Sequence, residues 1–535
     1  FSGRTRALGA MAGVVCAWLR NDLRLHDSPV LHRAAALAKE KGIPALPVYV
    51  IDPRLFQRTR RGTWKMGPFR ALFLLQSLRV LRRRLRKVGS NLLVKVGRPE
   101  EVLPSLLGDG SYLLTQQEVT SEELAVDGGV REALGGRVVW EYCWGSTLFH
   151  KDDLPFRPDL SDAPDVFTTF KNAVEPELAT RVNEVPGTFQ GKKTESKMRV
   201  RRCLPDVEEG SLPLPADLEI PDVEMAWADL PYSEAVEEPV PTEKAALQFV
   251  GGEEEALKRL KYYLWDTDLI AKYFDIRNGM LGGDYSTKLA AWLTLGCISP
   301  RKIFEEIRRY EKARTSNKST YWVLFELMWR DFFRFFAAKH GDGIFRRTAV
   351  AGGQRKWADD PQKFELWATG RTGYPLVDAN MRELQATGFM SNRGRQNVAS
   401  FLALDLDVDW RRGADLFESF LIDYDVTANW GNWLMAAGLG TGRVNRFNVI
   451  RQSKMYDEEG AYIRHWIPEL AEVPTQFIHQ PWMMSSSEKE WFHAEAYPRP
   501  CVDPNKFRET PEGKGKGGNM KRKEARKEEQ RKPRS

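Results

Sequence analysis

The 535-residue chain is long enough for two or more domains and a large hydrophobic core. No stretch approaches the roughly 18 consecutive apolar residues that a membrane-spanning helix requires, so we expect no membrane segment. The five cysteines and seven histidines show neither a CxxC pair nor metal-ligand spacing, which argues against a disulfide framework and a zinc site and favours a reducing compartment.

Both ends of the chain are basic. Arg4 and Arg6 precede the first acidic residue, Asp22, so the start is compatible either with the remnant of a transit peptide or with a cropped terminus. From Lys506 to Ser535 there are twelve Lys or Arg and five Glu, a net charge of +7 that leaves the rest of the chain neutral. We expect residues 503–535 to form a disordered tail, which either contacts nucleic acid or an organelle surface or is simply solvated.

Residues 12–150 alternate short apolar runs with amphipathic patterns. Five strands with a helix in each gap predict a parallel, doubly wound sheet. The first strand is followed by RNDLRLHD instead of a glycine-rich turn, which argues against a dinucleotide-binding dehydrogenase. The expected strands are residues 14–19, 45–52, 91–97, 112–118 and 137–144, and the expected helices are residues 28–41, 67–88, 99–107 and 120–134.

The next segment changes in composition. Between Cys203 and Glu243 lie seven prolines and twelve acidic residues but no Lys or Arg, which is typical of a linker that wraps or spans. We therefore assign residues 151–250 to a connector between two domains. From Glu253 helical patterns dominate to about Leu470, so residues 251–482 are predicted to form an all-α domain.

Two stretches of the helical domain allow two interpretations each. Tyr321–Phe336 has eight aromatics in sixteen residues, and its Glu326, Arg330 and Arg334 lie one turn apart. Taken alone, these charges indicate an ion-pair ladder along one helix. Ser286 and Thr287 follow a Gly-rich segment, where a helix start either binds a phosphate or is an ordinary N-cap.

Taken together, the motifs of the chain point to a single interpretation of the sequence. In order they are WLRNDLRLHD, WGSTLFHKDDLPF, KYFDIRNG, GCISPR, FELMWRDFFRF, NRGRQNVASF, DVDW and ANWGNW. With these motifs the chain resembles the photolyase and cryptochrome family from about Val14 to Trp482, and closely its cryptochrome DASH branch. The linker and the basic tail lie outside the matching motifs.

The resemblance implies FAD, bent into a U inside the helical domain. Arg330 would supply charge beside its phosphates, a role that suits the planar guanidinium. Asp423 would pair with Arg395, Asp425 would accept an N–H from flavin or sugar, and Asn429 would face flavin N5. Because an amide cannot protonate N5 as a carboxylic acid can, Asn429 favours an anionic reduced flavin. The phosphates are expected at Tyr273, Ser286, Thr287, Lys288 and Leu289, and the isoalloxazine and ribose at Asn392, Arg395, Asp423, Asp425 and Asn429. Ala290 stands where the family often has Ser, so one hydroxyl contact is lost.

The resemblance also implies an electron relay of three tryptophans. Trp433 matches the position nearest the flavin, Trp410 the middle one and Trp357 the outermost. For any single tryptophan, core packing is the ordinary interpretation. Trp430 matches no relay position, so we assign it to packing.

A pyrimidine dimer, flipped out of the strand, is the substrate that the resemblance implies. Glu326 would hydrogen-bond the dimer and donate a proton, Trp329 would stack on it, and Gln396 matches a DASH trait. Met435 replaces an aromatic of the relatives, which weakens stacking by about 1–3 kcal/mol per base. Asn392 stands where enzymes for six-four photoproducts have a proton-donating His, which argues against that lesion.

An antenna between the domains is a further implication. We expect 5,10-methenyltetrahydrofolate with Glu118 as its pterin contact, and a deazaflavin or an empty site are the alternatives. The leading hypothesis is light-driven repair of cyclobutane dimers in single-stranded or looped DNA by a monomer that also accepts RNA. A blue-light photoreceptor with vestigial repair is the rival, and a sequence-independent nucleic-acid binder is the third hypothesis. The compartment stays open among plastid, mitochondrion and nucleus, with an organelle favoured.

Overall fold

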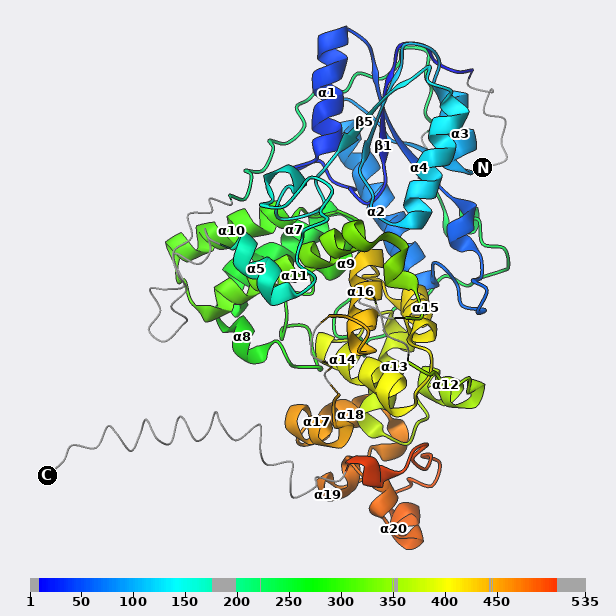
Figure 1. The fold of residues 1–535 in the computed structure, drawn as a ribbon, viewed down its shortest axis with the longest axis vertical. Helices are drawn as coiled ribbons and strands as arrows, with labels where there is room; N and C mark the ends of the chain where they lie inside the picture. Colours follow the sequence, from blue (N-terminus) through cyan, green and yellow to red (C-terminus); the bar gives the residue numbers. More distant parts are fainter. Residues whose placement is uncertain are drawn as a thin grey trace, which may run out of the picture.

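The computed structural model describes residues 9–175, 199–221, 223–348, 350, 355–441, 444 and 446–507. Within these ranges an N-terminal α/β domain sits on a helical domain, and the connector runs between them (Figure 1). No helix among the described residues is both long and apolar enough to cross a membrane. Arg4, Arg6 and residues 508–535 of the predicted tail lie outside the described residues.

The α/β domain is the predicted five-stranded parallel sheet. Its strand order is β3-β2-β1-β4-β5, and every pair of neighbours is parallel. Side chains of β1 alternate between two cores because successive residues of a strand point to opposite faces. Val15, Ala17 and Leu19 pack in the larger core with the helices α1 and α2, whereas Cys16 and Trp18 pack with α3 and α4. The strands are β1 (Val15–Leu19), β2 (Ala45–Ile51), β3 (Leu93–Val96), β4 (Tyr112–Gln116) and β5 (Val139–Cys143). The helices are α1 (Pro29–Lys41), α2 (Pro68–Lys87), α3 (Pro99–Leu106) and α4 (Ser121–Leu134).

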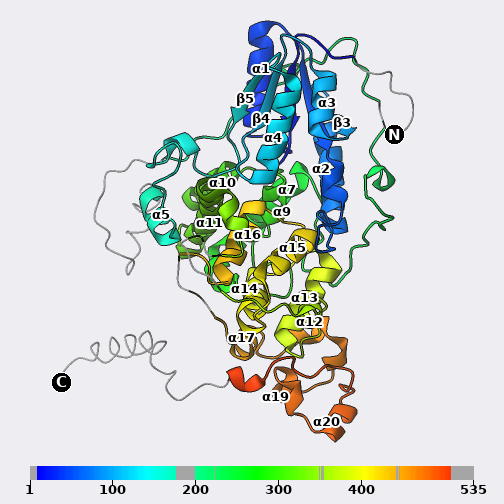
Figure 2. The same ribbon diagram turned by 45° about the vertical axis from the view of Figure 1, so that its right-hand side comes forward.

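The described part of the acidic segment is an extended strap along α2. Arg79 and Arg82 of α2 donate to the backbone carbonyls of Met225 and Val223, respectively. Proline has no backbone N–H, so some carbonyl oxygens of the strap have no backbone donor within the segment. These oxygens can therefore accept hydrogen bonds from the arginines of α2. Figure 2 shows it running along the outside of the α/β domain towards the helical domain. The described part of residues 151–250 also contains the helix α5 (Phe167–Val174).

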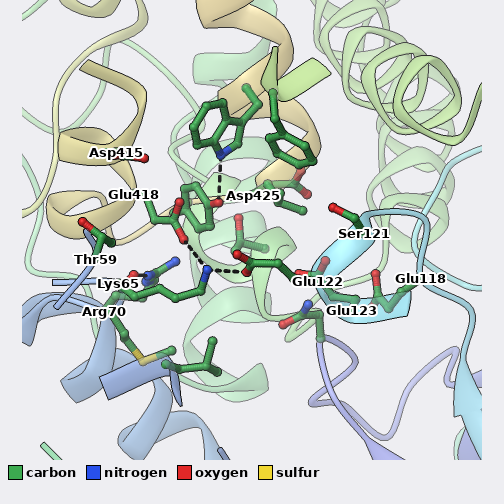
Figure 3. Close-up of a pocket in the computed structure, with 18 of the residues that line it drawn as sticks. Thr59, Lys65, Arg70, Glu118, Ser121, Glu122, Glu123, Asp415, Glu418 and Asp425 are labelled. Carbon is green, nitrogen blue, oxygen red and sulfur yellow. Dashed lines mark hydrogen bonds and ion pairs between the residues drawn. The ribbon is translucent and has the colours of Figure 1, made fainter. Parts of the chain in front are cut away.

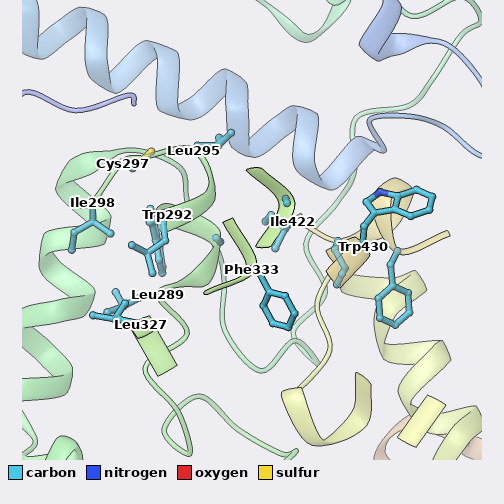
Figure 4. Close-up of a cluster of buried hydrophobic side chains, with 14 of the residues drawn as sticks. Leu289, Trp292, Leu295, Cys297, Ile298, Leu327, Phe333, Ile422 and Trp430 are labelled. Carbon is cyan, nitrogen blue, oxygen red and sulfur yellow. The ribbon is translucent and has the colours of Figure 1, made fainter. Parts of the chain in front are cut away.

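The second domain is helical, as predicted, and helices continue beyond Leu470. Its long central helix α11 carries the aromatic-rich stretch, and many of its aromatics are buried in the core shown in part in Figure 4. The first helices are α7 (Glu253–Lys261), α8 (Tyr273–Ile276), α9 (Ala290–Thr294), α10 (Pro300–Ala313), α11 (Lys318–His340), α12 (Pro361–Ala368), α13 (Pro375–Thr387) and α14 (Asn392–Ser400). The later ones are α15 (Trp410–Phe420), α16 (Val426–Ala436), α17 (Val449–Tyr456), α18 (Ala461–Trp466), α19 (Thr475–Ile478) and α20 (Ser486–Trp491).

Buried polar groups fix the two domains against each other. Asp27, which has no exposed surface, forms a bidentate ion pair with Arg301 at 2.6 and 2.9 Å. Asp331 on α11 accepts the backbone N–H groups of Leu148 and Phe149, both at 2.9 Å. Because an unpaired buried charge is costly, these contacts hold the domain interface in one register.

Candidate functional site

Residues 286–289 form a turn with unused hydrogen-bond donors. Among the described residues, no acceptor is found for the backbone N–H groups of residues 286–289 or for the hydroxyls of Ser286 and Thr287. Arg259 holds the turn by donating to the carbonyls of Gly283, Ser286 and Thr287 at 2.7–3.0 Å. Such a set of free donors suits an anionic phosphate, which accepts several hydrogen bonds at once.

The ordinary N-cap interpretation of this segment is wrong. Helix α9 starts only at Ala290 and is five residues long, and its N-cap residue Leu289 offers no side-chain acceptor. Lys288 adopts a left-handed conformation with φ of 55° and is 5% exposed. Its Nζ lies over the Tyr285 ring and has no hydrogen-bond partner among the described residues, and burial lowers its pKa well below the usual value. An anion bound nearby would relieve this isolated amine.

Two acid–arginine pairs lie beyond this turn. Arg395 binds both carboxylate oxygens of Asp423 at 2.8 and 2.9 Å, which confirms the predicted pairing. Asp425 caps α16 through the Ala428 N–H and lies 3.6 Å from Arg330. Burial alone would raise the pKa of Asp425, but Arg330 and the cap hydrogen bonds outweigh it, so the pKa falls below its usual value. Asp425 is therefore an ionised acceptor for a ligand N–H or hydroxyl.

Two asparagines border the same region differently. Asn429 is buried on α16, and its amide N–H donates to the Ala414 carbonyl at 3.1 Å. This hydrogen bond fixes the rotamer, and no donor among the described residues reaches the amide oxygen. Asn392 is exposed at the start of α14. Tyr273 is buried in the short helix α8, and its backbone N–H already donates to the Ile270 carbonyl, so its hydroxyl is the donor that it can offer a phosphate.

The charges of α11 do not form the ion-pair ladder. Glu326 accepts the indole N–H of Trp322 at 3.1 Å, and Arg330 donates to the Ser146 carbonyl across the domain interface. Arg334 pairs with Glu118 at 2.9 Å. A ladder is less favourable here because other domains and loops offer each charge a buried partner, whereas an intrahelical pair is worth only about 0.3–0.5 kcal/mol.

Glu326 is the residue of this helix that was predicted to donate a proton to the substrate. Burial raises its pKa, and the nearby Arg277 and the Trp322 hydrogen bond lower it less. Such a carboxyl retains its proton at higher pH than an exposed glutamate does, which suits a general acid.

The other side chains predicted to contact the substrate already touch neighbouring residues of the chain. Trp329 stacks on Phe167 of α5 at 3.6 Å between ring centroids, so one face of its indole is covered. Gln396 accepts from Arg393 at 2.9 Å. Met435 is half-buried and lies so close to Gly440 that a Cβ there would meet its sulfur at 2.0 Å.

The three relay tryptophans are brought together by α15 and its preceding loop. Trp433 packs on Gly413, where a Cβ would meet the indole at 2.2 Å, and Gly413 lies one turn after Trp410 on the same helix. Trp357 is placed next to this turn because Ala358 pairs with Val408. Their exposed fractions are 2% for Trp433, 0% for Trp410 and 7% for Trp357, so Trp357 is the outermost of the three.

Trp430 is a packing residue, as predicted, and it packs against the middle relay tryptophan. Its ring meets that of Trp410 edge to face, with 5.7 Å between centroids. Its indole N–H donates to the Tyr424 hydroxyl at 3.2 Å. Sequence comparison with relay positions gave no sign of this contact, because Trp430 meets Trp410 only once α15 and α16 are packed together.

A second site, the interdomain cavity, has a volume of roughly 790 Å³. Figure 3 shows Glu118, Glu122 and Glu123 on one side and Lys65, Arg70 and Glu418 on the other. Several buried polar atoms along it lack a partner among the described residues. These atoms are Gln116 Nε2, Glu118 Oε1, Ser146 Oγ, Arg70 Nε and Arg334 Nε. Unpaired donors and acceptors together fit a polar heteroaromatic ligand of the pterin kind, since buried polar groups otherwise need partners.

Sequence analysis predicted Glu118 for this cavity but not the other residues that line it, and Arg330 and Asp425, which it expected beside FAD, line the cavity as well. Arg70, Tyr424 and Glu418 come from α2, from a loop and from α15, and no local pattern joins them. The same is true of Arg259 under the turn and of Phe167 on Trp329. Their roles depend on contacts between segments far apart in the chain.

Comparison with known proteins gives concordant results. A family model for DNA photolyase matches residues 15–187, and one described as the FAD binding domain of DNA photolyase matches residues 322–512. A protein named cryptochrome DASH, chloroplastic/mitochondrial, from Ostreococcus tauri is 49% identical over 496 residues, covering 90% of this chain and 87% of that protein.

Solved structures agree with these matches. The crystal structure of a Synechocystis cryptochrome superposes with a TM-score of 0.82 at 43% identity, covering 93% of this chain and 98% of that one. An archaeal photolyase from Sulfolobus tokodaii, solved with two FAD molecules, has a TM-score of 0.69 at 25% identity and covers 93% of this chain and 97% of its own. That structure is described as implying a novel light-harvesting cofactor.

Proposed function

Because this chain belongs to the cryptochrome DASH branch of the photolyase and cryptochrome family, we propose that it repairs cyclobutane pyrimidine dimers in single-stranded or looped-out DNA, driven by blue light. Its FAD-binding domain makes it a flavoprotein. FAD, when bound and illuminated, supplies the one-electron chemistry that opens a cyclobutane ring. Single strands are favoured as substrates because the cost of unpairing the dimer has already been met.

The protein's own residues divide this work between binding and proton control. Residues 286–289 would take the phosphates, Arg330 would balance their charge, and Asp423, Asp425 and Arg395 would orient the rest of the cofactor. Asn429 would present an amide oxygen, without an acidic proton, to the redox-active ring. Asn392 and Tyr273 would close the sides of the same site.

The buried environment of Glu326 is the observation that carries the repair proposal. Burial raises its pKa above that of an exposed glutamate, although the charge of Arg277 and the hydrogen bond from Trp322 offset part of the rise, so Glu326 is the group that would donate a proton to a dimer carbonyl. The open face of Trp329, with Gln396 and Met435, would form the remaining walls of the dimer pocket.

Substitution of Glu326 tests this role. We expect Glu326→Gln to lower light-dependent dimer loss roughly 100-fold, because general acids contribute about 10²–10⁴-fold. Repair is followed with dimer-bearing oligonucleotides, single-stranded and duplex, and with RNA as a competitor. Glu365→Gln, an exposed glutamate on α12, is the matched control. Absence of light-dependent loss on every substrate in the unmodified protein would refute the repair proposal.

Photoreception is the second candidate function, and two contacts favour it. Phe167 covers one face of Trp329, and Met435 offers no aromatic face to a dimer. A protein with weak repair but intact flavin photoreduction would be the expected result for a receptor. The basic tail, outside the described residues, adds nothing to either side.

For the interdomain cavity we propose 5,10-methenyltetrahydrofolate as the antenna. The Glu118 carboxylate would hold the pterin through its unpaired Oε1 while Arg334 anchors the other oxygen. Glu118→Gln should lower folate affinity by roughly 10–100-fold, since a hydrogen bond to a charged group is worth about 1.5–3 kcal/mol. Fluorescence titration of folate measures this effect, while the unchanged FAD content serves as control. Folate binding that is equally tight in Glu118→Gln would contradict the assignment, and a second flavin in the cavity would replace it.

A further inference from the structure

The tryptophan relay has a second direction open to it. The buried Trp410 touches Trp430 at 5.7 Å, and Trp430 is hydrogen-bonded to Tyr424 at 3.2 Å. Both Trp430 and Tyr424 line the interdomain cavity, not the surface near Trp357. A continuous set of oxidisable rings therefore runs from the relay into the cavity.

Trp410 cannot readily keep a positive charge after losing an electron. Its indole nitrogen is buried and has no hydrogen-bond acceptor among the described residues, so the N–H proton has nowhere to go. A charge that cannot be neutralised in place moves on to a neighbouring ring. Trp357 is one such neighbour on the outer side, and Trp430 is another on the cavity side.

Tyr424 is equipped to end this second path. Its hydroxyl accepts from Trp430, and Glu418 lines the same cavity. Burial raises the pKa of Glu418 above its usual value, although Lys65, Arg70 and Tyr424 each lower it in part. The pKa of Tyr424 itself is raised well above its ordinary value by burial and then by Glu418, so the resting phenol holds its proton. A buried carboxylate with a raised pKa is a competent proton acceptor for that phenol.

Arg70 makes loss of that proton obligatory. Its guanidinium lies 4.5 Å from the Tyr424 ring centre, and burial lowers its pKa without removing its charge at neutral pH. A protonated, oxidised tyrosine would place a second positive charge against Arg70. Lys65, 3.6 Å from Glu418 and paired with Glu122, holds the accepting carboxylate in place (Figure 3).

We propose that Trp430 and Tyr424 form a second branch of the relay, which ends in a tyrosyl radical inside the interdomain cavity. One electron passes from Tyr424 through Trp430, Trp410 and Trp433 to light-excited FAD, and the phenolic proton passes to Glu418. The tryptophans return to their neutral state, so charge and protons balance. This inference rests on the light-driven relay of the proposed function. The radical would arise beside the antenna position, where a small-molecule reductant could return the electron.

Electron paramagnetic resonance of the illuminated holoprotein tests the branch. We expect a tyrosyl signal that narrows when the protein carries ring-deuterated tyrosine. The signal should grow several-fold in Trp357→Phe, which closes the outer exit, and disappear in Tyr424→Phe and Trp430→Phe. Tyr424→Phe keeps the ring against Arg70, so its bound FAD and thermal midpoint serve as folding controls.

Two results would overturn the branch. One is a tyrosyl signal that persists in Tyr424→Phe, and the other is a tryptophanyl signal alone in Trp357→Phe. Glu418→Gln supplies a separate readout: formation of the radical should slow and its solvent deuterium isotope effect should change, whereas a purely structural Glu418 would leave both as they are. Failure of the relay itself looks different, because then no organic radical of either kind forms and Trp433→Phe has no effect.

Discussion

Trp433→Phe is expected to slow light-driven flavin reduction at least about tenfold, equal to about 1.4 kcal/mol of activation free energy, while FAD stays bound. The indole is 2% exposed and packs against Gly413, so a phenyl ring fits the space but is much harder to oxidise. Absorbance of the flavin under blue light, with an external reductant present, measures the rate. Trp491→Phe is the matched control because that tryptophan is 78% exposed on α20 and far from the relay in sequence.

An unchanged rate in Trp433→Phe would mean that electrons reach the flavin by another route. Gly413→Ala gives an independent check of the same contact, since its new methyl group would meet Trp433 at 2.2 Å. We expect that variant to be both less stable and slower in photoreduction. These effects link the packing of one helix turn to the light response.

The largest loss of stability is expected from Asp27→Ala. Removal of the carboxylate leaves Arg301 buried without its bidentate partner, which costs about 3–5 kcal/mol. The domain interface, and with it the interdomain cavity, should loosen, so folate affinity falls as well. Thermal unfolding followed by circular dichroism measures the change.

Asp153→Ala supplies the comparison for this experiment. Asp153 also forms a bidentate pair with an arginine, Arg201, but its side chain is 33% exposed and that of Arg201 is 44% exposed. Solvent screens such pairs, so we expect a loss of no more than about 1 kcal/mol. Equal losses in Asp27→Ala and Asp153→Ala would contradict the view that the interface pair is energetically buried.

Much of the fold could be predicted from local sequence. The apolar runs of the α/β domain place all five strands within a few residues. The signal is clearest for the three central strands, β2, β1 and β4, which are buried between two helical layers and read as nearly continuous apolar stretches, whereas the edge strands β3 and β5 are partly exposed. The all-α domain was also predicted, although its helices continue past Leu470 to α20. The proline and acidic content predicted a linker. In the structure its described part is the extended strap, whose carbonyls accept hydrogen bonds from arginines on α2.

Site residues could be predicted only where they lie in a motif that matches the family. Asp423 and Arg395 were paired correctly from the family resemblance, and Glu118 was placed in the interdomain cavity. The ion-pair ladder on α11 was a wrong interpretation because helix periodicity says nothing of partners from other segments, such as Ser146 for Arg330. The packing role of Trp430 was predicted but its partner was not, since its contact with Trp410 exists only after α15 and α16 are packed.

The position of the flavin relative to these residues is the claim on which everything else depends. A crystal structure of the purified protein with its FAD measures it directly. We predict phosphate oxygens hydrogen-bonded to the N–H groups of Ser286–Leu289, the flavin ring against the Asn429 amide, and Trp433 in contact distance of that ring. Density that places the phosphates away from this turn, or the ring out of reach of Trp433, would contradict the account.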